Sequence, residues 1–137
     1  MTTLSSIQPM LLVADLARAV GFYRDVLGFE VRVLLPADEP FFAIVGRDGV
    51  GLLLKHISAD VEPIPNPQRH PWAKWDAFVG VAEPEELAAE IRGRVAGLAA
   101  GSSGAGQTFE VHDTEDGLRG LEVKDADGYV LFFGHPR

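Results

Sequence analysis

The stretch KDADGYVLFFG, residues 124–134, decides the predicted fold, because a nearly matching stretch occurs earlier in the chain. Its Asp-Gly pair predicts a tight turn, and the apolar run that follows predicts a strand. The earlier stretch, RDGVGLLLK at residues 47–55, has the same turn and the same kind of strand. In each, a bulky apolar residue stands four places after the turn glycine, Leu53 in the first and Phe132 in the second. The likeness indicates an internal repeat.

The elements predicted around these two hairpins follow the same order in both halves of the chain. In the first half, an apolar run at residues 7–13 predicts a strand, and apolar residues at helical spacing predict a helix that Asp15 caps and Gly28 ends. Three strands follow it, up to His56. The order recurs after roughly 70 to 80 residues, which is typical of a duplicated unit.

The second half contains a predicted strand at 75–82, a helix opened by acidic residues and a proline, and a loop of small residues at 99–107. The predicted apolar stripe of this helix is Leu87, Ile91, Val95 and Leu98. Three strands are expected after it, at 108–112, 118–124 and 129–134. The segment between the halves is rich in proline. We therefore predict an α+β protein, a single domain over residues 1–137, with two βαβββ modules at about 5–57 and 74–135 and a linker at about 58–73.

Each predicted sheet has one face for its helix and one face left over, because strand residues alternate sides. Two curved sheets set together would enclose a cup with these remaining faces. Its predicted apolar lining is Met10, Leu12, Leu53, Phe78, Val130 and Phe132. Its few polar groups are Gln8, Lys55 and Asp76, and Trp72 and Trp75 stand at its rim.

Composition excludes several classes of function. The chain has 137 residues, no cysteine and a formal net charge of −8. Cysteine-based catalysis and cysteine-ligated metals are therefore excluded. An acidic surface repels phosphate backbones, so we expect no nucleic-acid partner. No apolar run is long enough to span a membrane, and the N-terminus lacks the pattern of a signal peptide, so a cytoplasmic location is expected.

Two motifs carry a family resemblance. The close DADGY, residues 125–129, and the element order resemble the vicinal oxygen chelate superfamily, which includes glyoxalase I, extradiol dioxygenases and bleomycin-resistance proteins. The pattern D-L-x-x-x-x-x-F-Y-x-x-x-L-G-F of that superfamily is matched by Asp15, Leu16, Phe22, Tyr23, Leu27, Gly28 and Phe29. The resemblance implies a homodimer and a small-molecule site, with pockets formed within one chain or shared between two.

The resemblance also implies where a metal would sit. Metal-dependent members place up to four ligands at symmetric positions, which fall here on Gln8, Leu53, Asp76 and Phe132. Glutamine suits the first position and aspartate is chemically possible at the third. Leucine and phenylalanine cannot bind a metal, and one amide with one carboxylate is too few ligands for tight binding. We therefore predict no metal and no cofactor.

The function predicted from these observations is metal-independent binding of a small molecule, with an aromatic ligand favoured, as in bleomycin-resistance proteins. An enzyme is the alternative, either of the glyoxalase or dioxygenase type or a metal-free isomerase or lyase that uses Asp76 and Lys55. These two side chains could equally form a structural ion pair. A module that uses the fold only for association is a third possibility.

Overall fold

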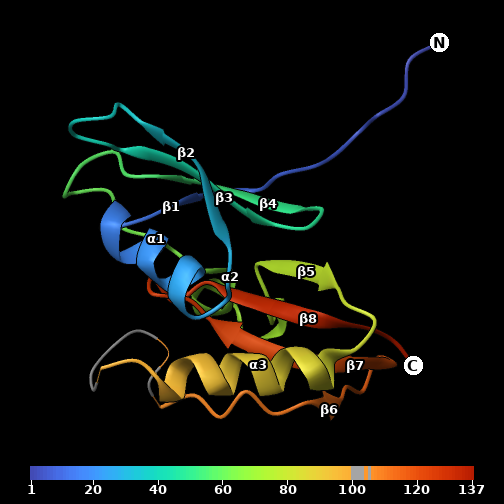
Figure 1. Ribbon diagram of the computed structural model, residues 1–137. Coiled ribbons are helices and arrows are strands. Elements are labelled where there is room, and N and C mark those ends of the chain that lie inside the picture. Colours follow the sequence, from blue (N-terminus) through green and yellow to red (C-terminus); the bar gives the residue numbers. More distant parts are fainter. Residues whose placement is uncertain (100–103, 105) are drawn as a thin grey trace.

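The computed structural model describes residues 1–99, 104 and 106–137, and it contains two βαβββ modules (Figure 1). The predicted duplication and the α+β class are confirmed. The elements of the first module are β1 (Met10–Leu12), α1 (Leu16–Asp25), β2 (Glu30–Leu35), β3 (Phe42–Arg47) and β4 (Val50–Lys55). Those of the second are β5 (Ala77–Gly80), α3 (Pro84–Ala96), β6 (His112–Asp113), β7 (Leu118–Lys124) and β8 (Val130–Pro136).

The two sheets have matching topology. Their strand orders are β1-β4-β3-β2 and β5-β8-β7-β6, so the first and last strands of each module run parallel side by side. The register is also equivalent, since Met10 pairs with Leu53 in one sheet and Phe78 pairs with Phe132 in the other. The repeat read from the two hairpins therefore reflects a structural repeat.

Helix α1 forms where the sequence predicts it. The Asp15 side chain accepts a hydrogen bond from Arg18 N at 3.0 Å and so caps the first turn. Beyond the end of the helix, Gly28 has a φ of 70°, a left-handed conformation that glycine adopts without steric cost. The predicted apolar stripe is buried in full: Leu16, Ala19, Val20, Tyr23, Val26 and Leu27.

Helix α3 has the same role in the second module with a weaker stripe. Pro84 stands in its first turn, together with Glu85 and Glu86 at the positive end of the helix dipole. Of the predicted stripe, Ile91 is buried, and Leu87, Val95 and Leu98 are partly buried and pack against the core; Ala88 is buried as well. The acidic opening and the apolar stripe together account for the start and the buried face of this helix.

One hydrophobic cluster connects the two modules. It contains the helix-side residues of the first sheet, such as Val45 and Leu54, and those of the second, such as Leu121 and Phe133. Because the helix-side faces of both modules contribute to the same core, the opposite faces of the two sheets are directed outward. We call these the uncovered faces. A single chain thus leaves open the two surfaces that were predicted to enclose a cup.

The linker is less irregular than its prolines suggest. It contains a short helix, α2 (Asn66–Arg69), and one 3₁₀ turn, η1 (Pro71–Ala73). The Asp76 carboxylate accepts a hydrogen bond from Asn66 N at 2.7 Å, at the start of α2. The linker is therefore attached to the beginning of the second module.

Three predicted boundaries differ from the structure. The strand expected over 108–112 is wrong for most of its length, because β6 holds only two residues; Phe109 has a φ of 53° and a buried side chain instead. β1 and β5 are shorter than the predicted 7–13 and 75–82. Of the predicted loop at 99–107, residues 100–103 and 105 lie outside the described part of the chain. Among the described helices, none has the length and apolar character needed to cross a membrane.

Candidate functional site

The uncovered faces carry the residues that the sequence assigned to a ligand site. On the first, Met10 is 52% exposed, and Leu53 and Lys55 are half-buried. On the second, Phe78 is 47% exposed. Exposed large apolar side chains on an open sheet face mark an interaction surface more often than a solvated one. β1 and β5, which carry Met10 and Phe78, are also edge strands.

Phe132 does not line an open surface. Its side chain is fully buried, which departs from the exposed lining role assigned to it from the sequence. Trp75 stacks on it with ring centroids 4.3 Å apart. The Phe78 ring is also nearly parallel to the Phe132 ring, with centroids 5.8 Å apart. His112 lies edge-on at 6.4 Å. Trp75, which is half-buried, and Phe78, which is exposed, are therefore the aromatic groups on the outside of this face.

Two glycines let the Phe132 ring lie flat. A Cβ added at Gly134 would stand 2.6 Å from Phe132 Cε1, and one at Gly120 would stand 2.8 Å from the same atom. Both distances are far below van der Waals contact. The strands beside Phe132 thus leave room for its ring against the sheet, which is why Trp75 can cover it.

Asp76 is held by backbone groups. Its Oδ1 accepts from Asn66 N at 2.7 Å and its Oδ2 accepts from Val130 N at 2.8 Å. Lys55 is absent from the ion pairs found between described residues, so the structural ion pair considered from the sequence does not form in this chain. The two oxygens instead join the linker, β5 and β8.

These contacts decide the fit of a metal at the four family positions. Leu53 and Phe132 offer no donor atom, and both Asp76 oxygens already accept backbone hydrogen bonds. The Gln8 side chain lies near Gly51 and is the remaining donor. The residues present therefore do not fit a metal centre. In the described part of the chain, no three His, Cys, Asp or Glu side chains are grouped in a way that could hold a metal ion.

Of the other predicted site residues, Trp72 is 85% exposed and lies edge-on to His70. Val130 is buried. Gln8 is exposed on the chain before β1. Trp72 is thus placed outside the cluster of Trp75, Phe78 and Phe132, at the linker.

Two polar residues of the second uncovered face were missed in the sequence analysis. Glu122 and His112 are exposed, and Trp75 Nε1 donates to Glu122 Oε1 at 3.4 Å. The signal was present, because Glu122 lies between the buried Leu121 and Val123 and so must point to the opposite face. The register of β7 with β8 places Glu122 beside Phe132.

A buried polar network fixes the turn between β7 and β8. Tyr23 donates to Asp125 Oδ2 at 2.6 Å, and Asp125 Oδ1 accepts from the backbone of Asp127 and Tyr129. Burial raises the pKa of the Asp125 carboxyl to about 6 and the pKa of the Tyr23 hydroxyl well above its usual value. The Tyr129 hydroxyl donates to Leu12 O at 2.6 Å. The closing DADGY motif thus connects the second module to α1 and β1.

Comparisons with known proteins agree with this architecture. Residues 6–40 match the family described as bleomycin resistance protein-like N-terminal. No curated protein matches the chain in sequence. Three solved structures share this fold, and each match covers almost the whole length of this chain and of the neighbour.

The bleomycin-binding protein from bleomycin-producing Streptomyces verticillus, complexed with copper(II)-bleomycin, is 21% identical with a TM-score of 0.64, and the match covers 100% of each chain. A glyoxylase/bleomycin resistance protein/dioxygenase domain from Frankia sp. EAN1pec is 18% identical with a TM-score of 0.67, covering 100% of this chain and 99% of the other. A glyoxalase-related enzyme from Clostridium phytofermentans is 16% identical with a TM-score of 0.67, covering 99% and 98%.

These neighbours have different descriptions on one fold, so they establish the architecture and leave the chemistry to the residues of the site. The sequence match at the N-terminus is to bleomycin-resistance-like proteins, and it spans β1, α1 and β2. The fold match extends over the second module as well. Together they show that the chain has the fold of these proteins and that residues 6–40 resemble the bleomycin-resistance-like family in sequence.

Proposed function

We propose that the protein binds a small, largely apolar molecule without a metal and without chemistry, in a cup that two copies of the chain complete. The observation that carries this proposal is the pair of uncovered faces, where Met10 and Phe78 are about half exposed in one chain. Both residues lie on edge strands. Setting β1 of one chain beside β5 of another would bring the two faces together and bury them.

The residues on these faces suit a flat ligand. Trp75 and Phe78 offer aromatic surface, and Leu53 and Met10 offer apolar surface opposite them. Lining of this kind, with a few polar groups, is typical of small-molecule sites. Glu122, Lys55 and Gln8 supply the polar groups. One structural neighbour is a bleomycin-binding protein complexed with copper(II)-bleomycin, which supports a small-molecule ligand.

The same contacts count against the enzymatic alternative. A general base must lie within hydrogen-bond reach of the proton that it removes. Asp76 accepts one backbone hydrogen bond on each oxygen, and these bonds connect it to the linker and to β8, which supports a structural role. Lys55 then has no acid partner for the isomerase or lyase reaction considered from the sequence.

Thermal unfolding tests the proposal directly. The protein, kept in a chelator, is mixed with copper-free bleomycin, with smaller aromatic cations, and with neutral and anionic aromatics. A ligand at 100 times its Kd stabilises the folded state by about 2.7 kcal/mol, which raises Tm by roughly 4 °C or more. We expect at least one aromatic compound to give this shift in the chelator.

A matched pair of variants locates the binding. Phe78→Asp should remove the shift, whereas Ile57→Asp, at an equally exposed residue outside the strands, should keep it. Binding that disappears on adding the chelator would overturn the metal-independent part of the proposal. Catalytic turnover of a bound compound would overturn its non-enzymatic part.

A further inference from the structure

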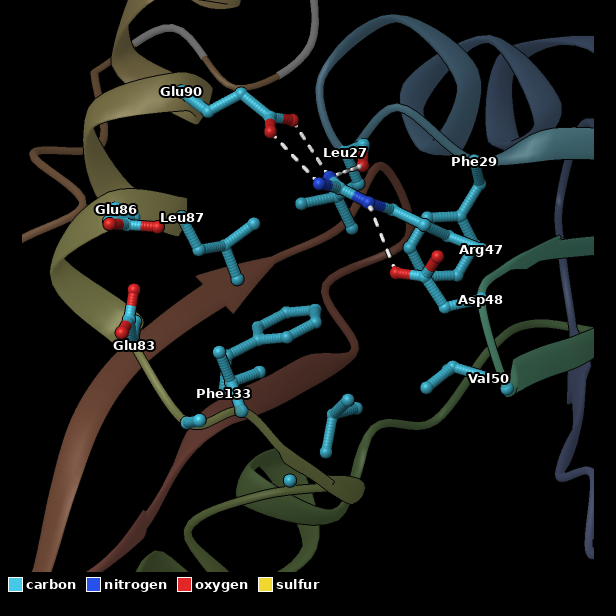
Figure 2. Close-up of a pocket in the computed structure, with 15 residues that line it drawn as sticks. Leu27, Phe29, Arg47, Asp48, Val50, Glu83, Glu86, Leu87, Glu90 and Phe133 are labelled. Atoms are coloured by element: carbon cyan, nitrogen blue, oxygen red, sulfur yellow. Dashed lines mark hydrogen bonds and ion pairs between the residues drawn. The ribbon is translucent and has the colours of Figure 1, made fainter.

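A cavity lies between the two modules, on the helix side of both sheets (Figure 2). Its volume is about 670 Å³, within the range of about 300–1,000 Å³ that small-molecule pockets occupy. Its walls come from the segment after α1, the β3–β4 turn, the end of β5 and the segment after it, helix α3 and β8. The cavity thus belongs to one chain and is separate from the uncovered faces.

The floor of this inter-module cavity is apolar. Phe29 and Phe133 are almost fully buried, and Val50, Val79 and Leu87 are partly buried around them. Figure 2 shows the Phe133 ring between Leu87 on one side and Val50 on the other. An apolar group of a ligand placed here would move from water into contact with hydrocarbon on several sides, and this transfer favours binding.

One cation at the cavity is already neutralised. Arg47 donates to both oxygens of Glu90, with nitrogen–oxygen distances of 2.7 and 2.9 Å, and also to Leu27 O at 3.0 Å. The pair joins the hairpin of the first module to helix α3 of the second. A bidentate pair of this kind fixes the guanidinium in place. Glu90 also accepts a hydrogen bond from Arg94, and Asp48 lies 4.0 Å from Arg47, so Arg47 is held as a structural wall of the cavity between two carboxylates.

Two carboxylates at the start of α3 have no such partner. Glu83 and Glu86 line the cavity and are exposed, and neither takes part in an ion pair among the described residues. They lie close enough that a hydrogen bond and the charge of Glu83 raise the pKa of Glu86. Like charges held together are stabilised by a cation placed between them. Figure 2 shows both on the same side of the cavity, next to Leu87.

We propose that the inter-module cavity is a second ligand site, and that it takes a small amphiphilic amine. The apolar body rests against Phe133, Leu87 and Val50, and the ammonium group lies at Glu83 and Glu86. The apolar floor favours the hydrocarbon part of this ligand, and the two carboxylates favour its ammonium group. The site needs only one chain, so it stands or falls independently of the cup proposed above.

The probes are three molecules of nearly equal size: phenylbutylamine, phenylbutanol and phenylbutyrate. Each is titrated into isotopically labelled protein, and the backbone amide spectrum is recorded. The amine should shift the amides of Gly49, Gly80 and Leu87, which all belong to the cavity wall, in a saturable way. The alcohol should shift them more weakly, and the carboxylate should leave them unchanged.

Charge variants separate the cavity from the acidic surface in general. Glu83→Gln with Glu86→Gln should weaken binding of the amine about tenfold, since each partly exposed ion pair contributes modestly. Glu62→Gln with Glu115→Gln removes two exposed carboxylates elsewhere and changes the net charge equally, so it should leave the affinity unchanged. Val50→Trp should block the floor and remove the shifts of Gly80 and Leu87.

Two results would overturn the proposal. One is equal binding of the amine and the carboxylate, because the acidic mouth would then contribute nothing. The other is an amine that shifts the amides of Met10, Leu53 and Phe78 and leaves those of the cavity unchanged, because the ligand would then occupy an uncovered face. The amide spectrum of each variant shows at the same time whether it has folded.

Discussion

Trp75 covers Phe132 with nearly parallel rings, at a centroid distance of 4.3 Å and an interplanar angle of 26°. Phe132 stands at one of the positions where the sequence resemblance predicts a metal ligand, and it is fully buried. The stack therefore turns a potential ligand position into part of the protein interior. It also makes the half-buried Trp75 the outer layer of this part of the sheet.

Replacing Trp75 by alanine should destabilise the protein, because Phe132 would lose its cover. We expect a loss of about 1–3 kcal/mol in the free energy of unfolding, measured by urea denaturation. Trp75→Phe keeps a ring over Phe132 and loses only the contact with Glu122, so it should cost less. Equal losses for the two variants would show that the stack contributes nothing.

Substitution by glutamate should have different effects at Leu53 and Phe132, which occupy equivalent positions in the two sheets. Leu53 is half-buried on an open face, so Leu53→Glu should change the free energy of unfolding by less than about 1 kcal/mol. Phe132→Glu would bury a carboxylate beneath Trp75 and should cost about 3 kcal/mol or more. Denaturation curves of the two variants, measured side by side, test this. Similar costs would mean that the two modules are equivalent in packing as well as in topology.

The fold could be predicted from the sequence because each element has a local signal. The Asp-Gly turns, the helical stripe before Gly28 and the strand alternation all agree on the same βαβββ order. Phe109 is the exception, since nothing local distinguishes a strand residue from one that packs into the core with a left-handed backbone. Its conformation depends on contacts with residues distant in sequence.

The site could be predicted only in part. Alternation places Met10, Leu53 and Phe78 on the uncovered faces, and the structure has them there. Alternation gives a face but does not say which side chains are covered, so the burial of Phe132 by Trp75 was not foreseen. The Asp76 bonds likewise depend on how the linker folds back, and the proline-rich sequence carries no signal for that.

The uncovered faces predict self-association. Light scattering at micromolar concentration should show a dimer, because the edge strands β1 and β5 are open and carry half-exposed apolar side chains. Met10→Lys or Phe78→Lys should shift the protein toward the monomer. Ile57→Lys, which adds the same charge at an exposed residue outside the sheets, should stay dimeric. A monomer in the unaltered protein would contradict the two-chain cup.

The buried Asp125 predicts a specific dependence of stability on pH. Burial raises the pKa of its carboxyl to about 6, and the hydrogen bonds from Tyr23 and from the backbone act in the opposite direction. In the unfolded chain the pKa of an aspartate is about 3.9. Between these values the folded protein keeps a proton that the unfolded chain has lost. The contribution of this group to stability is therefore fully present below about pH 4 and is lost as the pH rises through about 6.

Comparing Asp125→Asn with the unaltered protein isolates this effect. Asn keeps the shape and can still bond to Tyr23 and to the backbone of Tyr129, but it does not titrate.

The difference in unfolding free energy between the two proteins should change by up to about 3 kcal/mol between pH 4 and 7, in the direction that favours the variant at high pH. Asp25 and Glu90, whose pKa values are lowered by their arginine partners, act in the opposite direction at lower pH, and they cancel in this difference because both proteins contain them. Denaturant unfolding at several pH values gives the measurement, with Glu115→Gln at an exposed acid as the control for the loss of one negative charge. A constant difference between Asp125→Asn and the unaltered protein across this range would show that Asp125 is ionised throughout, and that the hydrogen bonds from Tyr23 and the backbone outweigh its burial.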